Sequence, residues 1–456
     1  MKYLLLFCLF VASAVSAQPL LKKNVLFIVV DDLRPLLGCY GDTIAHTPNI
    51  DRLAANGRVF DLAYCQQAVC APSRASFMTG RRPDALKIWT LSQPFRKQHP
   101  NIVTLPQYFM NNGYITAAAG KIYHDPAAHQ DPASWTLPAK FGVTGNGKYI
   151  LQENKGKSKA AAVERMDVED TAYVDGKVAD AAIDLLMQCK DQPFFLAVGF
   201  RRPHLPFTAP DKYWKLYDNK QLPLPDTTAP EGAPAIAFHQ SQELRGYTSI
   251  PEPRQLVHGY YAAVSYIDAQ VGKLLDALDR YNLTRNTIIV FFSDHGFHLG
   301  EQGMWCKSTN FEVATRVPLI ISAPGVVTHA GHTAAMTELV DLYPTLTSLC
   351  GIGQPDSLAG SSLVPVLRNP KARVKDYALS QFIRPYGAIS SVSKITTMGY
   401  SLRTDKYRFT EWYDFKSGEL VARELYEEGE KVNLAGKAGY ARQVSKLRSL
   451  LRNAIK

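Results

Sequence analysis

Four short segments of almost continuous apolar sequence constrain the fold of this 456-residue chain most strongly. Each has the length of one strand, and together they cover residues 25–30, 114–119, 194–200 and 287–293. Strands that are apolar throughout are typical of a parallel sheet buried on both faces. Amphipathic helical patterns lie between them, at residues 48–56, 105–112, 175–189 and 255–281. This alternation predicts an α/β fold with a large mixed, mostly parallel sheet flanked by helices.

The pattern changes after residue 372. Four strand-like segments and then one helical pattern follow, at residues 377–382, 399–403, 407–412, 420–426 and 440–453. They predict a small antiparallel sheet closed by a helix. We therefore expect a large domain over residues 18–372 and a smaller C-terminal α+β subdomain over residues 373–456. Within the large domain, residues 203–253 carry nine prolines, which predicts an ordered surface loop rather than regular structure.

The N-terminus resembles a secretory signal peptide over residues 1–17. Lys2 precedes an apolar stretch at 4–15, and small residues precede a cleavage point before Gln18. The alternative is a buried N-terminal strand. No other segment reaches the length of about 18 apolar residues that spans a membrane, so we expect no membrane attachment after signal cleavage. The expected location is periplasmic or secreted in a bacterium, or lysosomal in an animal cell.

The net charge of +10 favours an anionic partner such as nucleic acid, acidic lipid or a sulfated glycan, although solubility alone would also explain it. No run of five or more Lys or Arg residues occurs, so the charge is spread over the chain. We therefore expect no nucleic-acid partner.

Charged side chains follow each of the four apolar segments. In open α/β sheets ligands bind at the carboxyl ends of the strands, so we expect these side chains to meet at one edge: Asp31, Asp32, Lys121, His124, Arg201, Arg202, His204, Asp294 and His295. The carboxylates could bind a hard divalent cation, Ca²⁺ or alternatively Mg²⁺, with His295 as a ligand or close neighbour. Lys121 and His124 would share one face of a helical turn. Taken singly, each group could equally be a loop acid, a helix cap, a turn or surface charge.

Cys70 is the first residue of the most distinctive local motif, Cys70-Ala71-Pro72-Ser73-Arg74. Pro72 and Ser73 favour a helix start, which places Cys70 near the positive end of that helix. A free cysteine there would have a lowered pKa and be reactive, and Arg74 could pair with an anion beside it. A disulfide to Cys65, a buried inert thiol and a plain thiolate nucleophile are the alternatives.

This motif resembles the C-x-P-S-R signature of the sulfatase family, within the alkaline-phosphatase-like superfamily, and Thr79-Gly80-Arg81 resembles its continuation. Other positions that match this family occur in order: Asp31, Asp32, Lys121, His124, His204, Asp294, His295 and Lys307. Five stretches, beginning at residues 31, 66, 201, 294 and 399, most resemble the iduronate-2-sulfatase subfamily. Phe297 and Gln302 depart from its pattern, and we expect them near the pocket rim, where they would affect the choice of sugar.

The resemblance implies that a maturation enzyme oxidises Cys70 to Cα-formylglycine, whose hydrate is the nucleophile. It implies that the cation is held by Asp31, Asp32, Asp294, His295 and the modified Cys70. Arg74 would steady the hydrate, and Lys121, His204 and Lys307 would bind sulfate oxygens. His204 or Lys307 would protonate the leaving oxygen, and His124 would act as the base that releases sulfate.

The substrate implied is a sulfated saccharide, with a 2-O-sulfated uronate as the specific expectation. Alternatives are another sulfated glycan, a phosphomonoester or phosphonate for a hydrolase of the same superfamily, or a catalytically silent glycan-binding protein whose Cys70 is never oxidised.

Overall fold

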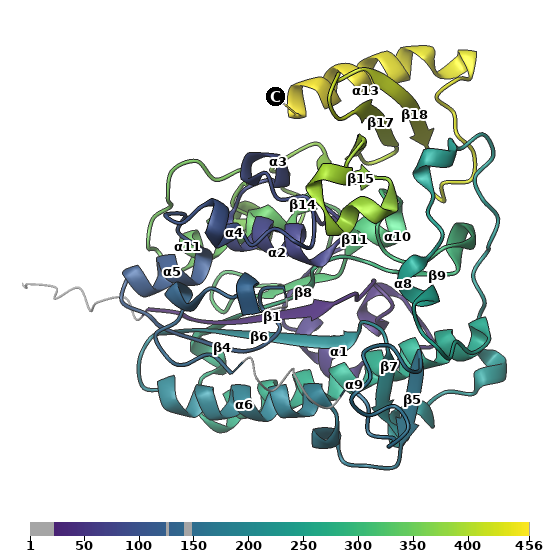
Figure 1. Cartoon of the computed structure of the whole chain (residues 1–456). Coiled ribbons are helices and arrows are strands. Elements are labelled where there is room, and N and C mark those ends of the chain that lie inside the picture. Colours follow the sequence, from purple (N-terminus) through teal and green to yellow (C-terminus); the bar gives the residue numbers. More distant parts are fainter. Residues whose placement is uncertain (1–21, 125–126, 141–147, 456) are drawn as a thin grey trace, which may run out of the picture.

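The structure is a computed structural model that describes residues 22–124, 127–140 and 148–455. Its centre is a seven-stranded sheet in the order β13-β2-β12-β8-β1-β6-β4 (Figure 1). These strands are, in that order, Gly331–Thr333, Arg58–Phe60, Leu319–Ser322, Thr287–Ser293, Asn24–Asp31, Phe194–Pro203 and Ile115–Gly120. The four from β8 to β4 run parallel, whereas β12 is antiparallel to both of its neighbours. The predicted mixed, mostly parallel sheet is confirmed.

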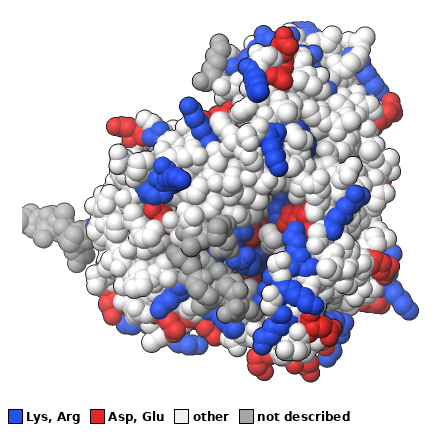
Figure 2. Space-filling model, viewed as in Figure 1, with Lys and Arg blue, Asp and Glu red and all other residues white. Residues whose placement is uncertain are grey.

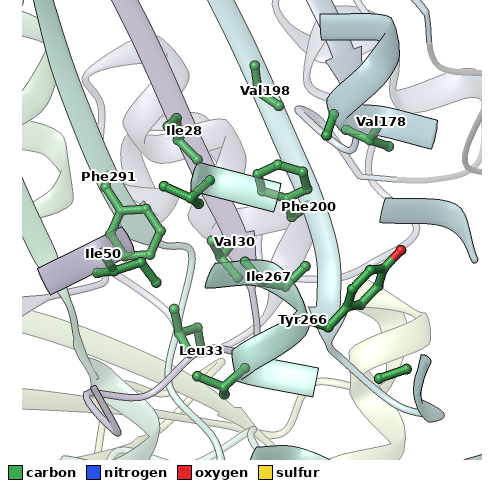
Figure 3. Close-up of a cluster of buried hydrophobic side chains, with 14 of the residues drawn as sticks. Ile28, Val30, Leu33, Ile50, Val178, Val198, Phe200, Tyr266, Ile267 and Phe291 are labelled. Atoms are coloured by element: carbon green, nitrogen blue, oxygen red, sulfur yellow. The ribbon is translucent and has the colours of Figure 1, made fainter. Parts of the chain in front are cut away.

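Helices cover both faces of this sheet (Figure 1). One face packs on α1 (Pro48–Ala54), α6 (Val174–Cys189) and α9 (Pro253–Arg280), and the other on α2 (Cys70–Thr79), α5 (Leu105–Asn111) and α11 (Leu342–Leu349). Alternate β1 side chains enter opposite cores. Ile28 and Val30 lie in the core shown in Figure 3, while Phe27 packs against Phe77 and Phe292 on the other side. This double burial explains why the strand sequences are apolar throughout.

The proline-rich segment is more regular than predicted. It contains β7 (Phe207–Pro210), α7 (Asp211–Trp214) and α8 (Gln242–Arg245). The prediction of an irregular loop is wrong for these elements because β7 finds a distant partner, the parallel strand β5 (Val163–Met166). Local sequence carries no signal for such a pairing.

The C-terminal sheet is antiparallel, in the order β15 (Ala378–Arg384), β16 (Thr397–Arg403), β17 (Arg408–Asp414) and β18 (Leu420–Tyr426). The amphipathic helix α13 (Ala441–Ala454) packs on it through Val444, Leu447 and Leu451. This arrangement confirms the smaller antiparallel sheet, while the boundary at residue 372 stays a prediction. The proposed signal peptide, at residues 1–17, lies outside the described residues.

None of the helices in the described ranges combines the length and apolar character that a membrane-crossing segment requires.

Glu312, in α10 (Glu312–Thr315), joins the two parts of the chain. Its carboxylate accepts hydrogen bonds from Arg403 and Arg408 of the C-terminal sheet, and from the Tyr64 hydroxyl at 2.8 Å. Burial alone would raise the pKa of Glu312, but Arg408 and Arg403 lower it to about 2. A carboxyl whose pKa falls on folding stabilises the native state above its unfolded pKa of about 4.3, and this contribution is lost as the pH falls toward 2.

We predict that Glu312→Gln lowers the free energy of unfolding by about 2 kcal/mol at pH 7, and that wild type and variant converge between pH 5 and pH 2. Urea titrations of both proteins across this range measure the difference directly. Taking the difference cancels contributions common to both proteins. A difference in the free energy of unfolding that is the same at pH 7 and pH 3 would contradict the lowered pKa of Glu312.

Candidate active site

The carboxyl ends of the parallel strands deliver charged side chains to one place. Asp31 is the last residue of β1, and Asp294 and His295 directly follow β8. Lys121 directly follows β4, and its backbone N–H donates to Gly199 O of β6 at 2.8 Å. The structure thus brings together residues that are as far as 264 positions apart, because parallel strands end at the same edge.

Cys70 is the first residue of α2, as its motif predicts, and is buried. Its Sγ lies 3.3 Å from Asp31 Oδ1, 3.3 Å from His295 Nε2 and 3.5 Å from Lys121 Nζ. Both Cys65 and Cys70 are free thiols, which excludes the disulfide alternative. The expected lowering of the Cys70 pKa is wrong for the unmodified thiol. Burial and then the Asp31 carboxylate raise its pKa well above the ordinary value, outweighing the Lys121 charge.

Carboxylates crowd around Cys70. Donor atoms of Asp31, Cys70, Asp294 and His295 lie within 4.8 Å of one another. Asp32 is also fully buried, and its Oδ1 accepts no hydrogen bond although His295 Nδ1 is 3.2 Å away. Burial raises the pKa of Asp32 well above its ordinary value, and the neighbouring carboxylates Asp31, Glu243 and Asp294 add to this against Lys307. An orphaned buried oxygen beside further carboxylates fits a hard divalent cation.

Arg74 and Lys121 neutralise this group from one side. Arg74 Nε donates to Asp294 Oδ2 at 2.8 Å, and its Nη1 donates to the carbonyls of Lys121 and Ile122. Lys121 Nζ pairs with Asp31. Both cations are almost completely buried, so removing either would leave an uncompensated charge in the interior.

Lys307 and His204 form the opposite wall. Lys307 Nζ lies 3.0 Å from Asp32 Oδ2 and 3.0 Å from Glu243 Oε1. His204 Nε2 lies 3.2 Å from the same oxygen of Glu243, and its Nδ1 lies 2.6 Å from Leu205 O. Sequence reasoning missed Glu243, because the short helix α8 offers no motif that would single it out.

These groups surround a cavity of about 340 Å³. Its lining is Val69, Cys70, Leu91, His124, Lys159, His204, Gln242, Glu243, Lys307, Tyr386 and Ile389. Figure 2 shows that this face of the molecule is hollowed, and that acidic and basic side chains gather in the hollow. At the floor of this cavity, Cys70 lies between carboxylates and cationic side chains. A ligand with an anionic group could therefore reach Cys70 through the cavity.

Comparison with known proteins identifies the family. The model of the family "Sulfatase" matches residues 23–352, and that of "N-sulphoglucosamine sulphohydrolase, C-terminal" matches residues 300–456. The chain belongs to the sulfatase family. It is therefore a hydrolase of sulfate esters.

Iduronate 2-sulfatases are among its relatives. The proteins of Mus musculus and Homo sapiens are both 37% identical to it, over 91% and 88% of this chain and 89% and 86% of theirs. Among solved structures, the phosphonate monoester hydrolase of Silicibacter pomeroyi has a TM-score of 0.78 at 23% identity, covering 95% of each chain. At that identity the likeness shows the shared fold alone.

His124 of this sulfatase lines the cavity, but the expected helical turn is absent between Lys121 and His124. The backbone N–H of Lys121 is instead held by Gly199 O of β6, at 2.8 Å. Burial, and then the Lys121 charge, lower the pKa of His124 to about 2, so its imidazole is neutral, and its buried Nδ1 has no hydrogen-bond partner.

Phe297 and Gln302 do not lie at the cavity rim. Phe297 is fully buried, stacks on Tyr260 and lies beneath Lys307, whose Nζ is 6.0 Å from its ring centre. The expectation that Phe297 lies at the rim is therefore wrong, because residues beside a strand-end motif can point inward as readily as outward. Gln302 is half-buried and is not among the residues that line the cavity.

We predict that Ca²⁺ stabilises the chelator-stripped protein, raising its melting temperature by about 3–5 °C at concentrations far above Kd. Asp32→Asn should lose this shift, because it removes one charge and one of the buried donor oxygens. Asp191→Asn, an exposed carboxylate outside the site, serves as the control and should keep it. Equal shifts in all three proteins would place Ca²⁺ elsewhere. Calorimetric titration with Ca²⁺ provides a second readout.

Proposed function

We propose that this chain is an exported sulfatase that removes the 2-O-sulfate of a uronate within a sulfated saccharide. The observation that carries the chemistry is the convergence of Cys70 with four candidate metal ligands and a cationic wall in one cavity. Support for the sugar comes from the 37% identity to iduronate 2-sulfatases over about nine tenths of the chain.

Two bound groups complete the proposed site. Asp31, Asp32, Asp294 and His295 would hold a divalent cation, Ca²⁺ or alternatively Mg²⁺, beside a formylglycine made from Cys70. When present, these groups supply a hydrated aldehyde as nucleophile and a positive charge that favours its ionised form. Arg74 is placed to orient the modified side chain, since its guanidinium lies 3.6 Å from Asp31 and pairs with Asp294.

The protein's own side chains then act on the ester. Lys121, His204 and Lys307 surround the position of the sulfate and are proposed to bind its oxygens. They would stabilise the charge that develops there, an arrangement already in place before the substrate arrives. His204 or Lys307, which both line the cavity, would protonate the leaving oxygen. His124, neutral and close to Lys121, would accept a proton in the step that frees the sulfate.

A lysine in the cavity is placed to bind the carboxylate of a uronate. Lys159 lines the cavity outside the proposed sulfate-binding set. Its Nζ donates to Glu243 O at 3.1 Å and lies 5.4 Å from the ring centre of Tyr247, which also faces Lys148. Two ammonium groups at this side would attract the carboxylate of a uronate.

Export and maturation belong to the same proposal. The signal-like N-terminus would direct the chain to the periplasm or outside of a bacterium, or to the lysosome of an animal cell. A formylglycine-generating enzyme would act on Cys70 before folding is complete, because the thiol is buried in the folded chain.

The deciding experiment measures free sulfate released from a 2-O-sulfated uronate disaccharide by protein whose Cys70 oxidation is verified by mass spectrometry. Release supports the proposal. Cleavage of an aryl sulfate without release from the disaccharide would redirect the search to other sulfated glycans. Faster cleavage of an aryl phosphate or phosphonate than of any sulfate would favour the phosphonate hydrolase alternative. A uniformly unmodified Cys70 in the native source would favour a silent glycan-binding protein.

We predict that Cys70→Ala lowers kcat by at least about 10⁴-fold, because no other nucleophile lies at this position. The circular dichroism spectrum should stay unchanged. Cys65→Ala is the matched control: Cys65 is a buried free thiol too, but does not line the cavity, so its variant should keep most of the activity. Sulfate release by purified Cys70→Ala at the wild-type rate would refute the proposed nucleophile.

A further inference from the structure

Glu243 is a carboxylate on the cavity wall that the sulfuryl chemistry does not require. It belongs to α8, which Ser241 precedes in a left-handed conformation with φ of 50°. Ser241 Oγ accepts a hydrogen bond from Trp305 N at 2.8 Å, and His239, whose Nδ1 accepts from Ser241 N, contacts Lys307 O at 2.6 Å. The position of Glu243 is therefore tied to the same segment that carries Lys307.

The wall has a clear order of charges. Lys307 Nζ lies midway between Asp32 and Glu243, 3.0 Å from each, and His204 Nε2 is 3.9 Å from Asp32 and 3.2 Å from Glu243. Moving outward from the Asp32 carboxylate, the Lys307 ammonium and the His204 imidazole come first and Glu243 second. The contacts of His204 and Lys307 with the Glu243 side chain are both made to Oε1.

An ionised carboxylate can only accept hydrogen bonds. A sulfate oxygen, which also only accepts, would be repelled by it, so the scissile sulfate must lie on the Cys70 side of Lys307 and His204. The ester oxygen then faces these two side chains, and the sugar carbon beyond it approaches Glu243. The group that suits Glu243 there is a hydroxyl on the neighbouring carbon, which can donate to it.

We propose that Glu243 is a specificity-determining residue that accepts a hydrogen bond from a free hydroxyl next to the sulfated carbon. It would also reject a second anionic group at that position. This inference rests on the proposed function, where the hydroxyl is the one on C3 of a 2-O-sulfated uronate. It narrows the substrate class to sulfate esters with an unsubstituted vicinal hydroxyl.

A purely structural role makes a different prediction. If Glu243 only holds Lys307 and His204 in place, its removal slows all substrates alike. If Glu243 accepts a hydrogen bond from the vicinal hydroxyl, its removal slows only substrates that carry that hydroxyl. The ratio of kcat/KM between two substrates therefore separates the roles, even for a variant whose overall activity is reduced.

The test measures kcat/KM of oxidised wild type, Glu243→Ala and Glu243→Gln on three disaccharides: the 2-O-sulfated uronate, its 3-deoxy analogue and its 2,3-di-O-sulfated analogue. Wild type should prefer the first over the 3-deoxy analogue by about 10–100-fold, as for a hydrogen bond to a charged group, and Glu243→Ala should reduce this preference to within about threefold. Glu243→Gln keeps the size but removes the charge, so its relative rate on the disulfate should rise about tenfold or more. Glu252→Ala, an exposed carboxylate nearby, is the control and should match wild type.

Equal preference for the hydroxyl in wild type and Glu243→Ala would overturn the inference, and so would a disulfate rate unaffected by Glu243→Gln. Failure of the proposed function is a separate result: wild type would then leave the uronate intact yet cleave catechol monosulfate and phenyl sulfate. That aryl pair differs by the same vicinal hydroxyl, so the ratio of their kcat/KM values in wild type and Glu243→Ala still decides the role of Glu243. A fully oxidised protein that cleaves none of these substrates refutes both proposals.

Discussion

The buried carboxylates Asp31, Asp32 and Asp294 set the conditions that the rest of this structure has to meet. Three negative groups in a dehydrated site repel one another strongly and are stable only if positive charge surrounds them. Arg74, Lys121 and Lys307 provide that charge from three different segments. The orphaned Oδ1 of Asp32 marks where this compensation is incomplete, which is the physical basis for proposing a cation there.

Close packing of the β4 and β6 backbones fixes the position of Lys121, one of these cations. A side chain at Gly199 would place its Cβ 2.0 Å from Lys121 O, and one at Gly120 would meet Gly199 O at 2.1 Å. Only glycine therefore lets the ends of β4 and β6 approach so closely that Lys121 reaches the site. Gly120 also has φ of +77°, a conformation that costs other residues energy. The position of a charged group thus depends on two residues that have no side chain.

The C-terminal sheet contributes to the site through Arg384, at the end of β15. Its guanidinium donates to the carbonyls of Ile236 and Ala237 in the proline-rich segment and to Ser308 O, next to Lys307. Tyr386, two residues further on, lines the cavity. The small sheet therefore braces both segments that form the wall with Lys307 and Glu243, and this explains why a site built on the large sheet is completed by residues beyond position 380.

The alternation of strands and helices follows from the amino-acid sequence alone, because hydrophobic periodicity is local. The ends of Thr287–Ser293 and Leu420–Tyr426 agree with the structure to the residue. The sequence also singled out Cys70 and the strand-end charges, because motif spacing and the carboxyl-end rule need no coordinates. Four features follow from the tertiary structure alone: the raised pKa of Cys70, the hydrogen bond of Lys121 N to β6, the burial of Phe297 and the presence of Glu243 on the cavity wall. Each of these features depends on which distant segments pack together. Burial removes water from Cys70 and Phe297, the pairing of β4 with β6 holds Lys121, and α8 is anchored to the segment that carries Lys307. The spacing of residues along the chain does not encode those contacts.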